Sequence, residues 1–106
     1  EKKVTDPQEV EWGLFIQYVE AYLNNVDSIM VQKSQPGIRF IKEGEEFDVE
    51  YASNIIRKQK NRLGNEPLLL NVQTLNVNME GQNITFFVTF FNGQQKEHTM
   101  YVTYSK

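Results

Sequence analysis

The amino-acid sequence predicts an α+β fold, in which a long N-terminal helix and a second helix pack on a curved antiparallel sheet of three or four strands. Two observations carry this prediction. Apolar residues recur at helical spacing through the first third of the chain, whereas residues 68–104 divide into three strand-like runs. The chain has 106 residues, enough for one hydrophobic core. We therefore expect a single domain over residues 1–106, with residues 1–5 as the end of a linker or stalk.

The first helix is predicted over residues 6–32. Asp6 suits the N-cap, Pro7 suits the first helical position, and Glu9 stands at the capping-box position. Asn24-Asn25 falls inside the segment and can bend or split the helix. The apolar positions follow at spacings of three and four, as expected for one buried face: Trp12, Phe15, Ile16, Val19, Tyr22, Leu23, Val26, Ile29 and Met30.

A second helix is predicted over residues 45–63, with Gly64 as its stop. Acidic residues fall in its first turns and basic residues in its last, an order that complements the helix dipole. The acidic residues are Glu45, Glu46, Asp48 and Glu50, and the basic residues are Arg57, Lys58, Lys60 and Arg62. Residues 38–41, between the two helices, form a short apolar patch that we interpret as an edge strand or a buried loop.

Three strands are predicted over residues 68–79, 84–91 and 96–104. Asn92-Gly93 favours a two-residue type I′ hairpin loop, which pairs Phe91 with Gln94. In that register one face of the sheet carries Phe87, Phe91, Met100, Val102 and Tyr104, and the other carries Ile84, Phe86, Val88, Phe90 and Tyr101. Because both faces are apolar, one is expected to meet the helices, and the other to be covered by more of the chain, by a pocket's contents or by a partner.

Composition excludes several classes of function. The net charge is −3, so no general attraction to nucleic acid is expected. The chain has no cysteine, which removes disulfides, thiolate nucleophiles and cysteine-ligated zinc. No apolar run is long enough to cross a bilayer, so any membrane attachment would need an anchor absent from this chain.

Candidate catalytic and binding residues are few. His98 is the single histidine and is interpreted as a surface or partly buried side chain, although a general base paired with one carboxylate is the alternative. The acidic run around Asp48 lacks the spacing of a calcium loop. Asn83-Ile84-Thr85 matches a glycosylation sequon that we attribute to chance. Aromatic residues of the first helix (Trp12, Phe15, Tyr18 and Tyr22) form either core or the wall of an apolar ligand cavity.

No catalytic residue, cofactor or metal ligand is therefore predicted. The candidate site is instead a partner-binding face of the sheet, formed by Phe86, Val88, Phe90 and Tyr101. Its choice over the opposite face depends on the inferred register, since a slip of one residue exchanges the two faces.

The order of elements, with the helix around Trp12 to Met30 first and the sheet of residues 68–104 last, resembles the cystatin-like and nuclear-transport-factor-like folds. Within these, the chain looks most like the extracytoplasmic domains of membrane-anchored scaffold proteins of Gram-positive conjugation (type IV secretion) machines, of the TraM and TcpC kind. The resemblance implies a non-enzymatic module on the outer side of the cell membrane, which contacts other protein components of the transfer machine or forms homo-oligomers. The alternatives are a ligand-binding or enzymatic member of the same cone-shaped fold, or an envelope sensing domain.

Overall fold

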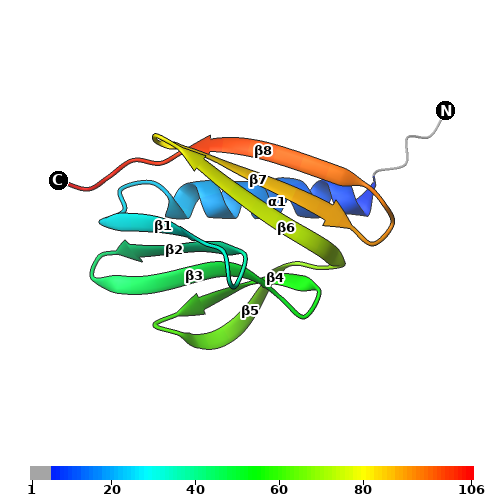
Figure 1. Ribbon diagram of the computed structural model, residues 1–106, viewed down its shortest axis with the longest axis horizontal. Coiled ribbons are helices and arrows are strands. Elements are labelled where there is room, and N and C mark those ends of the chain that lie inside the picture. Colours follow the sequence, from blue (N-terminus) through cyan, green and yellow to red (C-terminus); the bar gives the residue numbers. More distant parts are fainter. Residues whose placement is uncertain (1–5) are drawn as a thin grey trace.

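The computed structural model describes residues 6–106, which form one helix and eight strands (Figure 1). Helix α1 (Pro7–Tyr22) comes first. A five-stranded antiparallel meander follows, with β1 (Ser28–Gln32), β2 (Gly37–Lys42), β3 (Glu45–Ala52), β4 (Ile55–Lys60) and β5 (Leu63–Leu69). A three-stranded meander ends the chain, with β6 (Val72–Glu80), β7 (Asn83–Phe90) and β8 (Gln95–Tyr101). The fold is mostly β, so the predicted two-helix α+β fold of the cystatin-like or nuclear-transport-factor-like kind is wrong. The predicted linker, residues 1–5, lies outside the described residues.

Helix α1 begins as predicted but ends ten residues earlier. The carboxylate of Asp6 accepts a hydrogen bond from the Gln8 amide at 3.0 Å, and Pro7 occupies the first turn. The helix ends at Tyr22 because Asn25 adopts a left-handed conformation with φ of 65°, and its amide donates to the Thr103 hydroxyl at 2.8 Å. The Asn24-Asn25 pair therefore terminates the helix; Ile29 and Met30 beyond it belong to β1, and Val26 forms an isolated bridge with Tyr104.

The predicted second helix is in fact the hairpin of β3 and β4. Phe47, Val49 and Tyr51 alternate with acidic residues along β3, a period of two that puts the two kinds of side chain on opposite faces. Ser53 and Asn54 form the turn with positive φ angles of 51° and 68°, as a type I′ hairpin requires. The apolar patch at residues 38–41 lies in β2, which pairs with β1 on one side and β3 on the other. It is a strand, but not an edge strand.

The three C-terminal strands are confirmed, with a register that differs by one residue from the predicted one. Phe86 lies opposite His98, because the hairpin loop has three residues: the Phe90 amide donates to the Gln94 carbonyl, and Gly93 takes a positive φ of 90°. A three-residue loop of this kind is the next most common hairpin connection after the two-residue loop. The shift moves Met100 and Val102 to the buried face and Tyr101 to the exposed one.

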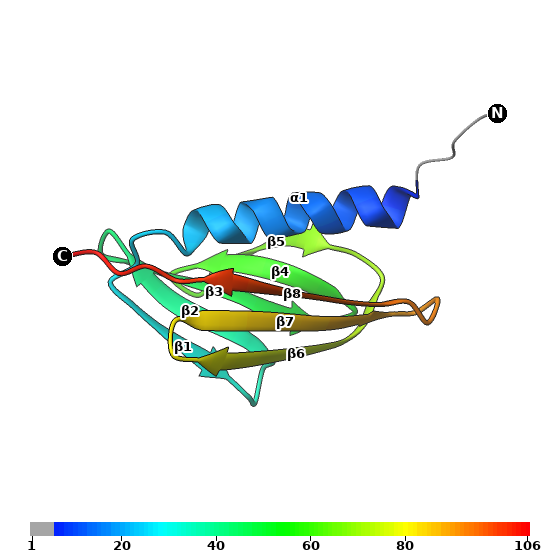
Figure 2. The same ribbon diagram turned by 90° about the horizontal axis from the view of Figure 1, so that it is seen from above.

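The two sheets and the helix enclose one core. Figure 2 shows α1 along one side of the molecule, nearest to β5 and β8, with β1 and β6 on the side away from it. β6 lies across the first four strands of the larger sheet and brings the two sheets together. Large, fully buried side chains come from all three layers: Phe15, Val19 and the C-cap residue Leu23 from the helix, Phe40, Ile38 and Ile56 from the larger sheet, and Phe86, Phe90 and Ile84 from the smaller one.

Candidate interaction surface

His98 pairs with one carboxylate, as the general-base alternative requires, but the pair lies on the surface. Its Nε2 atom is 3.1 Å from Oε2 of Glu20, and both side chains are well exposed, at 38% and 47%. The contact joins β8 to α1, as does the ion pair between Lys96 and Glu9 at 3.1 Å. Both contacts therefore attach the helix to the edge strand of the smaller sheet.

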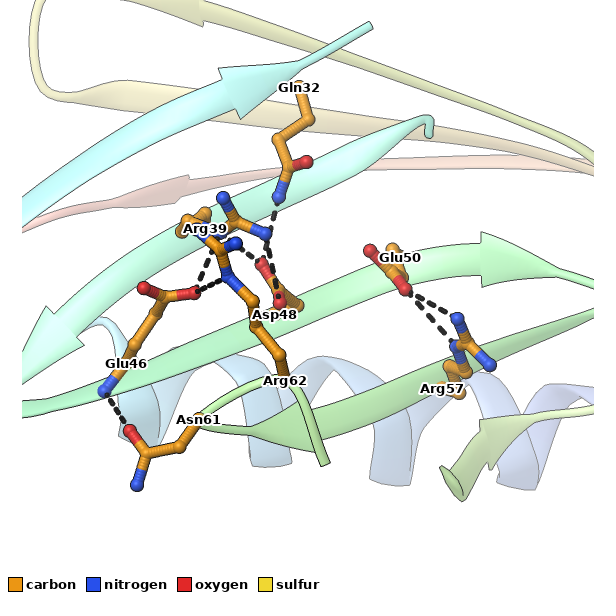
Figure 3. A network of polar contacts seen from close by, with 8 residues as sticks. All are labelled: Gln32, Arg39, Glu46, Asp48, Glu50, Arg57, Asn61 and Arg62. Atoms are coloured by element: carbon orange, nitrogen blue, oxygen red, sulfur yellow. Dashed lines mark hydrogen bonds and ion pairs between the residues drawn. The ribbon is translucent and has the colours of Figure 1, made fainter. Parts of the chain in front are cut away.

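The acidic run of β3 is neutralised by neighbouring strands (Figure 3). Asp48 is 1% exposed and accepts hydrogen bonds from Nε of Arg39 at 2.7 Å and from Nε2 of Gln32 at 2.8 Å. The hydrogen bond to Asp48 raises the pKa of Arg39. Glu46 accepts a bond from Arg62 at 2.9 Å, which lowers the pKa of Glu46.

Glu50, which is 5% exposed, accepts two hydrogen bonds from Arg57, at 2.8 and 3.1 Å. The acidic and basic runs are thus cross-strand partners, and the prediction that they cap the two ends of a helix is wrong. In Figure 3 helix α1 lies behind the sheet that carries these side chains, so the ion pairs occupy the outer face of the larger sheet, away from the helix. Among the described residues, no group of three or more His, Cys, Asp or Glu side chains is placed to hold a metal ion.

Lys58 lies on the inner face of the larger sheet, under the helix. Its ammonium group donates to the hydroxyls of Tyr18 and Tyr22, both at 2.8 Å, and lies 3.3 Å from Glu66. It also lies 4.9 Å from the centre of the Tyr22 ring and 5.8 Å from that of Phe47. Burial alone lowers the pKa of Lys58, but the hydrogen bonds outweigh it and raise the pKa well above its usual range. This set of residues, the Lys58 cluster, fixes α1 to the sheet.

The aromatic residues of α1 are packed against both sheets. Phe15 meets Phe86 edge to face with ring centres 5.9 Å apart, and Trp12 meets Phe90 in the same way at 6.5 Å. Tyr22 contacts Phe40 of β2. Of the two interpretations of these side chains, core packing is the one that these contacts support.

The structure separates the four residues predicted to bind a partner. Phe86, Val88 and Phe90 point into the core and are at most 1% exposed, whereas Tyr101 is 60% exposed on the opposite face of the smaller sheet. A contact surface formed by all four together would require the core to open. Partner binding by Tyr101 alone stays a prediction, and variants of Tyr101 test it against the surface of α1.

A different apolar surface lies where α1 meets the edge strand β5. Leu14 is 61% exposed on the outer side of the helix, and Leu70 is 47% exposed just after β5. Two adjoining hollows, of about 260 and 220 Å³, run between helix and strand and share Leu14, Pro67 and Leu68. We call this region, made by Leu14 and residues 67–70, the α1–β5 surface. Glu11 and Glu66 line its two ends.

Sequence reasoning missed the α1–β5 surface because it assigned these residues elsewhere. Leu68, Leu69 and Leu70 were taken together as the start of a strand, but only Leu69 is buried. The available signal was the run of three leucines itself, since neighbouring residues of a strand point to opposite faces and cannot all be buried in a sheet with one wet face. Leu14 is also an apolar residue that falls outside the predicted apolar stripe of the helix, which was a second signal.

Comparison with known proteins places the chain in a family. A family model described as "Putative Competence protein ComGF" matches residues 1–96, nearly the whole sequence. No curated protein and no solved structure matches this chain. The match overturns the resemblance to scaffold proteins of conjugation and type IV secretion, because the family is one of competence. No helix in the part of the chain that the structure describes is long and apolar enough to cross a membrane.

Proposed function

We propose that this chain, which belongs to the ComGF family of competence proteins, is a non-enzymatic structural subunit of a DNA-uptake pilus. In this role the domain lies on the extracytoplasmic side of the membrane and contacts other subunits of the pilus. The observation that carries the proposal is the α1–β5 surface, where Leu14 and Leu70 remain exposed beside the hollow that Pro67 and Leu68 line. Exposed apolar surface of this kind on a folded domain marks a site of protein contact.

The shape of the molecule fits a role in an assembly. In Figure 2 all the strands lie on one side of α1, so no other element of the described part of the chain covers the outer side of the helix. That side carries Val10, Leu14 and Ala21, all exposed, in line with the α1–β5 surface. A neighbouring subunit can therefore reach the helix and β5 together.

Charge distribution favours a structural role over direct binding of DNA. Five basic residues of the larger sheet and its β4–β5 turn form ion pairs there: Arg39 with Asp48, Arg57 with Glu50, Lys58 with Glu66, Lys60 with Glu45, and Arg62 with Glu46. Lys42 of β2 instead donates to backbone carbonyls at the end of α1. Binding to the phosphate backbone depends on cations that can replace counterions. A net charge of −3 leaves no surplus of such cations in the chain.

The test is transformation of naturally competent cells that carry a charge on the α1–β5 surface. Leu14→Lys in the full-length protein is expected to lower transformation frequency at least tenfold, because it buries a charge in the contact. Tyr101→Lys is the matched control, since Tyr101 is equally exposed but lies on the smaller sheet. Normal transformation by Leu14→Lys, at an unchanged protein level, would show that this surface is not used.

A further inference from the structure

The molecule has a second open feature on the side away from α1. There the outer edges of β1 and β6 form the rim of the two-sheet sandwich. β6 pairs only with β7, and β1 only with β2. Beyond those ladders, the described residues include no backbone partner for residues 73–80 or 28–32. Both strands therefore present a row of backbone N–H and C=O groups to solvent.

A groove runs between these two edges. It consists of two hollows, of about 420 and 240 Å³, that share Val31, Lys33 and Val77. Its walls are residues 31–33 and residues 75–79, and we call it the β1–β6 groove. Val31, Val77 and Met79 are only partly buried against the core. The groove thus combines apolar side chains below with unpaired backbone groups at the sides.

The other two edges of the sheets are protected, and β6 is not. Pro67 and two register irregularities interrupt the edge strand β5. The edge strand β8 lies beside α1, which contacts it through His98 and Lys96. β6 has nine residues, no proline, no lysine, and one irregularity near its start. Natural sheets avoid an edge of this kind, because it pairs with any available strand. The unprotected edge of β6 therefore indicates that a strand from another chain pairs with it.

We propose that the β1–β6 groove binds one extended segment of another polypeptide, which adds a strand to the edge of β6. Backbone hydrogen bonds would hold the segment, and alternate side chains would enter the space beside Val31, Val77 and Met79. The segment fits if it alternates apolar and small polar residues and carries an acidic residue near Lys33. The proposal adds a partner site to the proposed pilus role, separate from the α1–β5 surface, and is tested separately.

Two other occupants fit less well. The open strand edges that the described residues of a second copy offer are β1 and β6, and each comes attached to further strands and to the opposing sheet, whereas the groove is bounded by strands on both sides. Nucleic acid is disfavoured because Lys33 is the one cation among the residues that line the two hollows. A single strand satisfies both the backbone groups and the apolar floor.

The test uses a synthetic nonapeptide of alternating valine and threonine with a glutamate at each end, added to the ¹⁵N-labelled domain. Amide shifts are expected at residues 31–33 and 75–79, together with slower hydrogen exchange along β6. A second peptide with proline in place of the central valine is expected to bind at least tenfold more weakly, because proline cannot donate to the ladder. This peptide comparison requires no variant to fold.

Val77→Lys, which charges the groove, is expected to weaken binding at least tenfold, whereas Val10→Lys on the helix leaves it unchanged. Equal affinity for the two peptides, absence of binding at the solubility limit, or shifts centred on the α1–β5 surface would each overturn the proposal. So would a symmetric dimer joined through β6 in sedimentation and cross-linking. Normal transformation by the Leu14→Lys variant would not affect the proposal for the β1–β6 groove, since that variant tests the α1–β5 surface.

Discussion

Replacing Lys58 by methionine tests whether the Lys58 cluster holds α1 on the sheet. Methionine keeps the length and most of the packing of the side chain but removes its charge. It leaves the hydroxyls of Tyr18 and Tyr22 with only each other, at 3.4 Å, and leaves Glu66 without its cation. The Lys58 side chain is only 14% exposed, whereas Glu66 is 54% exposed, so we expect the two tyrosine hydroxyls to contribute more than the ion pair.

The expected loss follows from the contacts. Two hydrogen bonds from a charged donor contribute about 1.5–3 kcal/mol each, and the aromatic rings add about 1 kcal/mol. The cost of keeping an ammonium group largely out of water offsets a few kcal/mol of this. We expect a net loss of about 2 kcal/mol in the free energy of unfolding, or roughly 10 °C in Tm for a domain of this size. Lys60→Met is the matched control, because Lys60 lies on the same strand, pairs with Glu45 at 3.0 Å, and is 53% exposed. Its loss is expected to stay below about 1 kcal/mol.

The assay is urea unfolding followed by circular dichroism at several pH values. The pKa of Lys58 is raised in the folded state above its ordinary value of 10.5, so its contribution is complete below that pH and is lost as the pH rises through the folded value. The difference between Lys58→Met and the parent is therefore expected to be constant from about pH 6 to pH 9 and to shrink in stronger alkali. Equal losses for Lys58→Met and Lys60→Met, or a difference that grows above pH 10.5, would refute the reasoning.

Two further substitutions test the interior. Asp48→Ala is expected to cost about 3 kcal/mol, since it removes a buried carboxylate that accepts hydrogen bonds from Arg39 and Gln32 and leaves Arg39 only its 3.2 Å contact with Glu46. Glu45→Ala, which removes a 44% exposed partner of Lys60, is expected to cost less than about 1 kcal/mol, and urea unfolding of the two variants decides this. Phe86→Ala is expected to cost about 3–4 kcal/mol because its ring is fully buried, and the neighbouring Phe87→Ala, at 39% exposure, about 1 kcal/mol; the reverse order in thermal unfolding would show that the opposite face of β7 is the buried one.

The sequence revealed the start of α1 and the existence of the last three strands. Asp6 and Pro7 are local signals, and their effect does not depend on the rest of the chain. Asn92-Gly93 marked its turn correctly but not the length of the loop. The loop length is set by tertiary context, because only the three-residue loop brings Met100 to the same face as the buried Ile84, its cross-strand partner.

The β3–β4 hairpin shows why a correct pattern can support a wrong structure. Acidic residues followed by basic residues favour a helix through its dipole, but the same order places opposite charges across a hairpin. Glu50 opposite Arg57 is the result. The alternation of Phe47, Val49 and Tyr51 with acidic residues was the decisive observation, and the turn at Ser53-Asn54 carries no glycine to mark it.

The candidate surfaces could not be deduced from the sequence, because each is made of elements far apart in the chain. Leu14 and Leu70 meet only when the helix lies beside β5, and Val31 meets Val77 only when the two sheets close on each other. Both arrangements follow from the strand order, which depends on the hairpin that was taken for a helix.

The most direct test of the proposed role is site-specific cross-linking in competent cells. The 106 residues contain no cysteine, so one introduced thiol is the only reactive thiol in this domain. A Leu14→Cys variant of the full-length protein, labelled with a maleimide that carries a photoreactive benzophenone, is expected on illumination to give a conjugate that mass spectrometry identifies as containing another pilus subunit. Tyr101→Cys is expected to remain monomeric. If Leu14→Cys stays monomeric, or if Tyr101→Cys cross-links as efficiently to the same subunit, the α1–β5 surface is not the contact that holds this protein in the pilus.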